Sequence, residues 1–305
     1  MVIRPMMFFK KAYNINSSQP EVCVVHLIRE KNGIEPFKNF LESYCKNKGN
    51  CEHDLLFIFK GFYRKKNIEK YYCLLQKFNI ACKYLFLCDF GYDIRAYLKV
   101  ARTFDYKYYC FLNSYSVILD EKWLDKMYYY ISKNGVGLVG ATGSYESLYN
   151  NFLIDHDINE NTPLFRKMKA HCSRKLMPCR LKFLFDHFPN YHIRTNGFMI
   201  SRLVMLSKPC ELIMGKFDAI MFESGKNSLT RQVMKMNLKA LVVGKDGIGY
   251  EKEDWYKSNT FRQGDQKNLL IADNRTNAYM YADVSAKRKL SLLAWGDESK
   301  VSEEQ

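Results

Sequence analysis

Polar side chains follow several apolar runs in the first half of the chain, where buried strands would end. The clearest set is the quartet Asn113-Ser114-Tyr115-Ser116, which follows the apolar run 108–112 and offers amide and hydroxyl groups. The other polar residues at such points are His26, Arg29, Lys60, Asp89, Asp93 and Arg95. Cationic side chains bind phosphate oxygens, and a carboxylate such as Asp89 can accept hydrogen bonds from a base edge or a ribose hydroxyl. These residue types favour a nucleotide ligand.

Most of these residues also have a purely structural interpretation. Asp93 could serve only as the N-cap of the helix that follows it. Arg29 and Lys60 could be solvated charges at strand ends, and His26 is flanked by apolar residues, as core histidines are. Asp89 is the strongest single candidate, because it stands just beyond an apolar run.

The elements that would position these side chains are repeated β-α units. Strands are predicted over 22–28, 54–59, 83–88 and 108–112, and apolar residues at helical spacing follow each of the first three. Strands separated by helices of this length imply a mostly parallel sheet with right-handed crossovers. Consecutive parallel strands end on one edge, where open α/β sheets bind their ligands. The sequence therefore predicts an α/β fold with the polar residues along one crevice.

The composition is that of a globular protein, with 305 residues of which 47% are hydrophobic. No apolar run reaches the roughly 18 residues that a membrane span needs, and no secretion signal is recognisable at the N-terminus. The ten cysteines show no C-x-x-C spacing, which favours free thiols over disulfides or a zinc site. We expect a cytoplasmic protein, with peripheral attachment to the inner face of a membrane left open.

The net charge of +15 predicts attraction to polyanions, which include nucleic acid, an anionic bilayer surface and phosphorylated ligands. The basic residues are spread through the chain and no nucleic-acid-binding module is recognisable, so nucleic acid is the least favoured partner. Neither a G-x-x-x-x-G-K-[ST] loop nor a G-x-G-x-x-G turn after the first strand is present. Charge alone does not choose among the remaining partners.

Two segments, Asp89-Phe-Gly-Tyr-Asp93-Ile-Arg-Ala96 and Phe111-Leu112-Asn113-Ser114-Tyr115-Ser116, resemble the nucleotide-sugar motifs of family-2-like glycosyltransferases with a GT-A fold. The wider set of motifs, which includes GLVGATGSYES, PNYHIRTNGFMISR and TFRQGDQKNLLIADNRT, is similar to a group of bacterial glycosyltransferase-like proteins. The resemblance implies transfer of a sugar from a nucleotide-sugar donor to a hydroxyl of a glycan or lipid-linked acceptor. It also implies a GT-A-like, mostly parallel sheet in a single domain.

The resemblance covers residues 20–296 and divides the chain into functional parts. Residues 20–150 would bind the nucleotide-sugar, residues 151–190 form a basic excursion, and residues 191–296 hold the acceptor half and a closing segment. Residues 1–19 are expected to be an N-terminal extension, and residues 297–305 a flexible tail. The basic excursion could fold over the site, lie on an anionic membrane or be a solvated loop.

The quartet departs from the family pattern, in which a D-x-D motif supplies a carboxylate to a divalent cation. Asn113, Ser114 and Ser116 are neutral, whereas Mg²⁺ or Mn²⁺ prefers charged oxygen ligands. The ion could still be held by the diphosphate with weak help from the protein. We favour the alternative that cationic side chains, with Arg95 and Lys60 as candidates, neutralise the leaving group, and we expect weak metal dependence.

The resemblance places the acceptor-side residues in the C-terminal half. A loose match to the family's acidic motif puts Glu223 before a helix with Leu229 and Arg231, as the general base of an inverting transfer. Its structural alternative is a first-turn acid favoured by the helix dipole. Asp246, in a glycine-rich turn, is the reserve candidate for base or metal ligand. The residues expected near the acceptor are Arg194, Asn196 and Arg231.

Two other classes of function compete with the enzyme. The missing D-x-D motif leaves open a catalytically inactive protein that binds sugars or nucleotides, and the charge leaves open a basic nucleic-acid-binding protein. Turnover with a nucleotide-sugar separates the first alternative from the enzyme. Retention on heparin that is lost on competition by DNA but not by nucleotide-sugars would favour the second.

Overall fold

An eight-stranded sheet forms the centre of the computed structural model, which describes residues 19–154, 179–207 and 213–296. The strands follow the order β11-β10-β6-β9-β4-β1-β2-β3. Their bounds are β1 Val22–Arg29, β2 His53–Lys60, β3 Lys83–Leu87, β4 Tyr108–Leu112, β6 Val136–Gly140, β9 Gly197–Ser201, β10 Lys239–Val243 and β11 Gly249–Tyr250. The first four agree with the predicted strands to within one residue at each end.

The sheet is mostly parallel. Strand β1 pairs in parallel with β2 and β4, β2 with β3, and β10 with β6. Strand β9 lies between β4 and β6 and is antiparallel to both, and β11 is antiparallel to β10 at one edge. Two short ladders lie beside this sheet, one between β5 (Val117–Ile118) and β12 (Ile271–Ala272), the other between β7 (Gly143–Ser144) and β8 (His192–Ile193).

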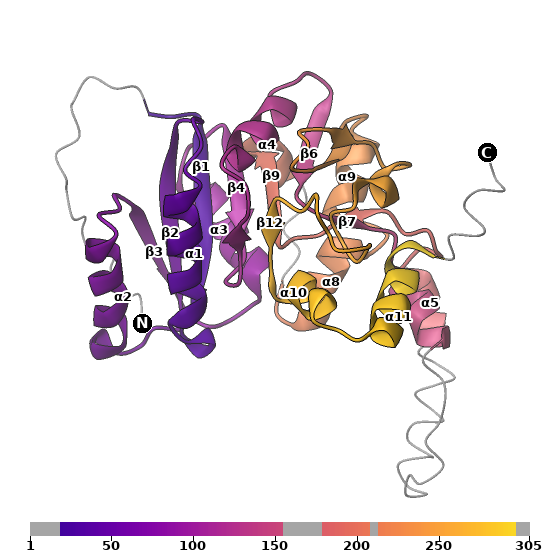
Figure 1. Cartoon of the computed structure of the whole chain (residues 1–305), viewed down its shortest axis with the longest axis horizontal. Coiled ribbons are helices and arrows are strands. Elements are labelled where there is room, and N and C mark those ends of the chain that lie inside the picture. Colours follow the sequence, from indigo (N-terminus) through magenta and orange to yellow (C-terminus); the bar gives the residue numbers. More distant parts are fainter. Residues whose placement is uncertain (1–18, 155–178, 208–212, 297–305) are drawn as a thin grey trace, which may run out of the picture.

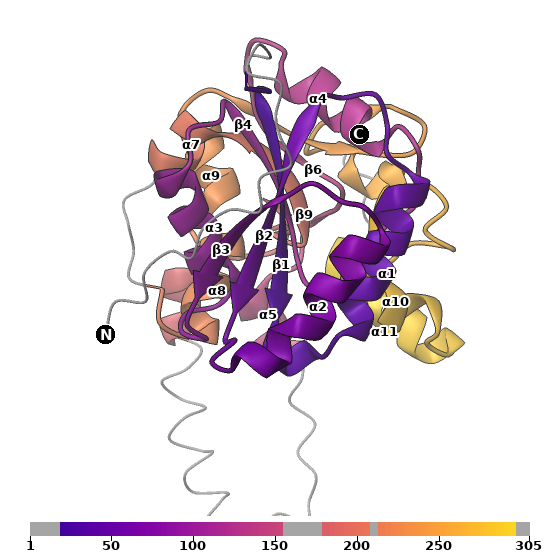
Figure 2. The same ribbon diagram turned by 90° about the vertical axis from the view of Figure 1, so that its left-hand side faces the viewer.

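Helices cover both faces of the sheet (Figures 1 and 2). One face packs against α1 (Glu35–Lys46), α2 (Lys65–Lys77) and α4 (Trp123–Ile131). The other face packs against α3 (Asp93–Thr103), α7 (Arg202–Ser207), α8 (Lys216–Ser224) and α9 (Leu229–Lys235). Further helices are α5 (Leu148–Ile154), α10 (Asn274–Met280), α11 (Val284–Trp295) and the 3-10 helices η1 (Glu30–Asn32) and η2 (Trp255–Ser258). The predicted α/β class, a mostly parallel central sheet flanked by helices, is confirmed.

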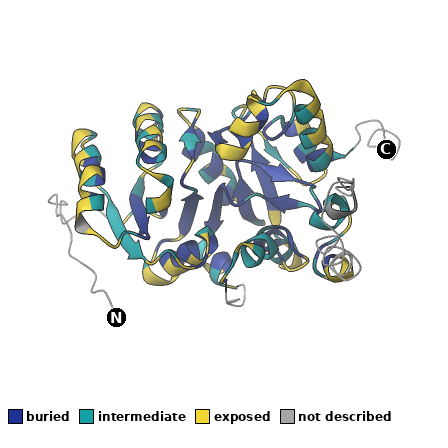
Figure 3. Cartoon of the chain, turned by 90° about the horizontal axis from the view of Figure 1, so that it is seen from below, coloured by how far each residue is buried: buried dark blue, intermediate teal, exposed yellow. Residues whose placement is uncertain are grey.

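The strands alternate between two hydrophobic cores, because successive side chains of a strand point to opposite faces. In β1, Val25 and Leu27 join the core under α3, whereas Val24 and Ile28 join the core under α1. The strands accordingly appear as a buried layer between helices with exposed outer surfaces in Figure 3. This burial on both faces explains why β1 and β4 read as continuous apolar runs.

His26 belongs to the core beneath α1 and does not line the strand edge. Its ring is completely buried and stacks on Phe40 with 3.8 Å between ring centroids, while Phe37 and Phe57 lie around it. Neither ring nitrogen has a hydrogen-bond partner in the part of the chain that the structure describes. Burial lowers the pKa of His26 to about 3, so the folded protein holds the neutral ring at any ordinary pH.

A His26→Phe variant should gain stability over the wild type as the pH falls. The unfolded chain protonates His26 below its ordinary pKa of 6.5, and the folded chain does so only near pH 3. The wild type should therefore lose about 2 kcal/mol of unfolding free energy relative to the variant between pH 8 and pH 5. Urea denaturation of both proteins at the two pH values measures this difference. An equal change of unfolding free energy with pH in the two proteins would contradict a buried, neutral His26 ring.

Several sequence-based expectations concern residues outside the described ranges. These are the N-terminal extension, the tail at 297–305 and the part of the basic excursion between 155 and 178. Among the residues that are described, no helix combines the length and apolar character needed to cross a membrane. The eight cysteines within those ranges are all free thiols, although only Cys23 and Cys110 are buried.

Candidate functional site

The carboxyl ends of β1, β2 and β3 carry a charged cluster around Asp89. Arg29 donates two hydrogen bonds to this carboxylate, from Nε to Oδ1 at 2.6 Å and from Nη2 to Oδ2 at 3.0 Å. Lys31 lies 3.1 Å from Oδ2. Burial alone would raise the pKa of Asp89, but the hydrogen bonds from Arg29 and Lys31 outweigh it and lower the pKa. Asp89 is therefore an ion-pair partner in this structure, and its free acceptor capacity is small.

Lys60 supports the loop between β3 and α3. Its buried ammonium group donates to the carbonyl oxygens of Gly91 and Tyr92, the latter at 2.8 Å. Gly91 has a φ of 61°, and a Cβ atom there would lie 2.6 Å from the Ile213 carbonyl oxygen, so the loop requires glycine. Arg95 is exposed on α3, and its guanidinium carbon lies 4.5 Å from the centroid of the Phe90 ring. Lys60 therefore positions the loop, and Arg95 stays accessible to solvent.

Exposed aromatic rings surround this part of the edge. Phe90, Tyr92 and Tyr115 each keep between 38% and 43% of their surface exposed. Both tyrosines are close enough to Arg29 to affect its pKa electrostatically. Exposed rings beside a guanidinium group are suited to stack on a nucleobase.

The quartet after β4 forms a compact turn. The Asn113 side-chain oxygen accepts hydrogen bonds from Tyr115 N at 2.9 Å and from Ser116 Oγ at 3.3 Å. Ser116 is completely buried, and its Oγ also contacts the Asn196 carbonyl oxygen at 3.3 Å. Ser114 is buried too. The side chains of Asn113 and Ser116 are thus used to shape the turn.

These contacts decide how well the quartet suits a divalent cation. Asn113 Oδ1 already accepts two hydrogen bonds, Ser116 Oγ is buried within the turn, and neither group is charged. Within the described ranges, no group of three or more His, Cys, Asp or Glu side chains is arranged to hold a metal ion. The residues at this position do not fit Mg²⁺ or Mn²⁺, which require several oxygen ligands.

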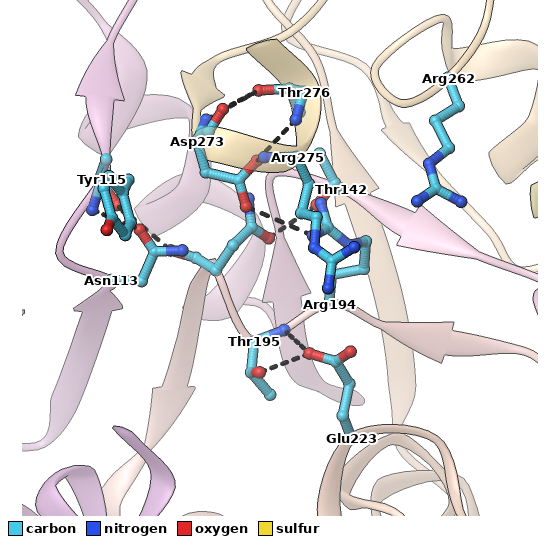
Figure 4. A network of polar contacts seen from close by, with 12 residues as sticks. Asn113, Tyr115, Thr142, Arg194, Thr195, Glu223, Arg262, Asp273, Arg275 and Thr276 are labelled. Carbon is cyan, nitrogen blue, oxygen red and sulfur yellow. Dashed lines mark hydrogen bonds and ion pairs between the residues drawn. The ribbon is translucent and has the colours of Figure 1, made fainter. Parts of the chain in front are cut away.

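Residues 194–196, between β8 and β9, lie at the same edge. Arg194 and Thr195 are labelled in Figure 4. Because β9 is antiparallel to β4, its first residue Gly197 pairs with Leu112, the last residue of β4. Asn196 accepts a hydrogen bond from Asn113 N at 3.0 Å through its carbonyl oxygen. Its side-chain oxygen accepts one from Thr142 Oγ1 at 2.8 Å, while its buried Nδ2 has no partner within residues 19–154, 179–207 and 213–296. The predicted residue Asn196 is therefore in direct contact with the quartet.

Glu223 belongs to helix α8 and contacts the segment 194–196 at this edge. Its Oε2 accepts hydrogen bonds from Thr195 N at 2.7 Å and from Thr195 Oγ1 at 2.5 Å, as Figure 4 shows. Its Oε1 has no partner among the residues that are described. The carboxylate is half-buried. Its Oε2 is held in place by Thr195, and its Oε1 can accept a hydrogen bond or a proton from a ligand.

The helix position of Glu223 corrects the sequence-based expectation. Glu223 was expected just before a helix, but it lies in the last turn of α8, and α9 begins at Leu229 with Ser228 as its N-cap. The helix dipole does not favour a carboxylate at a helix C-terminus. The first-turn interpretation of Glu223 is therefore wrong.

Asp93 is an acidic neighbour of Glu223. Burial raises the pKa of Asp93 to about 6, and the negative charge of Glu223 adds to this effect. Its Oδ1 accepts a hydrogen bond from Ile94 N at 3.0 Å at the start of α3. The structure thus brings together one carboxyl group from each half of the chain.

Three arginines, each from a different segment, lie in the same region of the molecule as Glu223 (Figure 4). Arg194 donates to Asp273 Oδ2 at 3.3 Å, and Arg262 pairs with Glu146 at 3.0 Å between Nη1 and Oε2. The guanidinium carbons of Arg194 and Arg262 lie 4.1 and 4.9 Å from the centroid of the Phe261 ring. Arg275 is exposed, and its guanidinium group has no ion-pair partner within the described ranges. We call Arg194, Arg262 and Arg275 the arginine cluster.

The remaining two predicted residues have structural partners. Arg231 on α9 pairs with Asp186 at 3.0 Å. Asp246 accepts hydrogen bonds from Ile248 N at 2.9 Å, Tyr250 OH at 2.7 Å and Asn268 Nδ2 at 2.8 Å. Both oxygens of Asp246 therefore stabilise the turn between β10 and β11.

Several residues of this site were not singled out from the sequence as site residues. They are Thr142, Glu146, Thr195, Phe261, Arg262, Asp273 and Arg275. Most lie in short irregular segments with no apolar periodicity. All seven fall within the motif texts GLVGATGSYES, PNYHIRTNGFMISR and TFRQGDQKNLLIADNRT, which carry the family resemblance. Trp255 and Trp295, which could have stacked on a sugar, are buried in the core.

No protein-family model matches the chain, and no curated protein matches it. Among solved structures, a mannosyltransferase from Pyrobaculum calidifontis in complex with GDP-Man and Mn²⁺ has a TM-score of 0.47 and 8% identity, over 91% of this chain and 70% of that chain. Core-mannan synthase A from Aspergillus fumigatus, in a Mn/GDP form, has a TM-score of 0.37 and 7% identity, over 74% and 71%. A 4-diphosphocytidyl-2C-methyl-D-erythritol synthase from Anaerococcus prevotii has a TM-score of 0.38 and 10% identity, over 67% and 83%. Likeness at this level carries no argument about activity, which has to be argued from the site.

Proposed function

We propose that the protein is a glycosyltransferase that moves a sugar from a nucleotide-sugar to a hydroxyl group. The observation that carries this proposal is the Glu223 carboxylate, with Oε2 held by Thr195 and Oε1 available, at the edge of the sheet where the parallel strands end. A carboxylate held in this way is suited to accept one proton from an alcohol. The resemblance of the quartet segment to nucleotide-sugar motifs supports the choice of donor.

The proposed reaction is a single displacement that inverts the sugar carbon. The acceptor oxygen forms a bond to the anomeric carbon while the bond from that carbon to the phosphate oxygen breaks. The electron pair of the broken bond leaves with the nucleoside diphosphate, and the acceptor proton passes to Glu223 Oε1. The hydrogen bonds from Thr195 keep the carboxylate in place while charge develops at the sugar.

The proposed donor position lies along the ends of β1 to β4. The exposed rings of Phe90, Tyr92 and Tyr115 offer stacking surfaces for the base, and Arg29 stands beside the two tyrosines. The acceptor would approach Glu223 from the side of α8. By the same resemblance, the proposed acceptor class is a glycan or a lipid-linked glycan, in surface polysaccharide or glycoconjugate synthesis.

A screen of UDP-, GDP-, TDP- and CMP-sugars tests this function. We expect one nucleotide family to raise the melting temperature, with EDTA or with Mn²⁺ present. With the matching nucleotide-sugar and a mixture of glycan and lipid-linked acceptors, we expect release of the free nucleotide coupled to a glycosylated product. Stabilisation by a nucleotide-sugar without any product would instead identify a binding protein, and absence of any stabilisation would overturn the donor class.

A further inference from the structure

We infer that the arginine cluster, Arg194, Arg262 and Arg275, binds the diphosphate of the donor and takes the charge-neutralising role that the quartet cannot give to a metal ion. The inference deepens the proposed function and rests on it for the identity of the ligand. It replaces Arg95 and Lys60, the cations considered from the sequence, because Lys60 is bound to backbone carbonyls and Arg95 lies over Phe90.

Unused donors are the first observation in favour of an anion at this place. Three side-chain nitrogens, Arg194 Nη1, Arg262 Nε and Asn196 Nδ2, are buried and have no hydrogen-bond partner among the described residues. Arg262 is 7% exposed and Asn196 4% exposed, so both are held by the fold. A buried donor without a partner costs about 1 to 3 kcal/mol, and phosphate oxygens are acceptors that would satisfy such donors.

The charge balance is the second observation. Asp273 pairs with Arg194 and Glu146 pairs with Arg262, whereas the guanidinium group of Arg275 has no ion-pair partner among the described residues. Burial lowers the pKa of Arg262, and the positive charges of Arg194 and Arg275 lower it further, so the three groups are close enough to repel one another. A diphosphate would relieve this repulsion, and guanidinium groups pair well with phosphate oxygens.

The position of the cluster is the third observation. Arg194 is the neighbour of Thr195, which holds Glu223, and its Asp273 partner belongs to the same network in Figure 4 as Asn113 and Tyr115. A diphosphate bound there would lie beside the segment 194–196, which contacts both the quartet and the proposed base. Developing negative charge on the leaving oxygen would then be met by fixed cations, which need no rearrangement during the reaction.

Isothermal titration with inorganic pyrophosphate in the presence of EDTA tests the inference without any turnover. Arg275→Gln and Arg262→Gln should each raise the Kd by about tenfold or more, because each removes charge-assisted hydrogen bonds. The matched control is Arg102→Gln, which removes an exposed guanidinium at the far end of α3 and should leave the Kd unchanged. Circular dichroism and melting temperature report whether each variant is folded, and the exposed Arg275 keeps the test independent of the buried Arg262.

Two results of the titration would overturn the inference. One is wild-type affinity for pyrophosphate in Arg275→Gln and Arg262→Gln, and the other is pyrophosphate binding by the wild type only when Mn²⁺ is present. Failure of the proposed function has a different outcome, in which pyrophosphate binding depends on the arginines but no nucleotide-sugar is turned over. Sugar transfer that is unaffected by Arg275→Gln would keep the function and remove the cluster from it.

Discussion

Replacing Glu223 by glutamine should lower the turnover number by about 10²-fold or more and change donor affinity little. Glutamine keeps the shape of the side chain and can still accept hydrogen bonds from Thr195 through its amide oxygen. Its amide nitrogen, however, has no lone pair suited to take the acceptor proton. Steady-state kinetics with the donor found in the nucleotide-sugar screen, together with titration of that donor, separate the two effects.

Two further variants sharpen this measurement. Glu42→Gln makes the same chemical change at an exposed position on α1 and should leave turnover unaltered. Thr195→Val removes the hydroxyl donor to Glu223 but keeps the backbone donor, so turnover should fall by about tenfold, less than in Glu223→Gln. Near-normal turnover in Glu223→Gln would show that the carboxylate only links α8 to the segment before β9.

Replacing Asp273 by alanine should destabilise the protein by about 3 kcal/mol or more. The Asp273 side chain is 1% exposed and performs two tasks. Its Oδ1 caps α10 by accepting hydrogen bonds from Arg275 N at 2.9 Å and Thr276 N at 2.8 Å, and its Oδ2 pairs with Arg194. The variant loses the cap and leaves a largely buried guanidinium without its carboxylate. Denaturation by urea measures the change in unfolding free energy.

Asp283→Ala is the matched control for this prediction. Asp283 caps α11 by accepting a hydrogen bond from Ala286 N at 2.8 Å, but it is exposed and pairs with no arginine in the described part of the chain. Its replacement should cost about 1 kcal/mol, the usual value of a helix cap. Equal losses in the two variants would mean that the Arg194–Asp273 pair adds nothing to stability.

The parallel half of the sheet could be predicted because its signals are local. Strands β1 to β4 are apolar runs separated by amphipathic helices, and this alternation fixes both direction and edge. The insertion of β9 between β4 and β6 could not be predicted, since five residues of sequence do not state which neighbours they pair with. Helix α8 was not predicted, because its nine residues show no clear amphipathic spacing, and Glu223 was therefore placed only before the helix that follows.

The site was predictable to the extent that strand ends mark it. Asn113, Ser116, Asn196 and Glu223 meet at the predicted edge, although their contacts differ from those expected. The roles of Lys60 and Asp89 were not readable, because a charge at a strand end can face a ligand or a neighbouring charge. Arg262 and Arg275 required knowledge of the path of an irregular segment, which depends on tertiary contacts and not on periodicity.

The pairing of β12 with β5 has a consequence for the order in which the site can form during synthesis. Ile271 and Ala272 pair with Ile118 and Val117, so a late segment of the chain is anchored to the turn that follows β4. A nascent chain that ends near residue 250 already contains the quartet and Glu223, but it lacks Arg262, Asp273 and Arg275. Domains begin to fold while the ribosome is still extending them. The strands from β1 to β10 can therefore pair before the candidate site has all of its residues. Two of the three residues of the arginine cluster, Arg262 and Arg275, are added only when the segment from Phe261 to Thr276 has been synthesised and packs against the part of the protein made earlier.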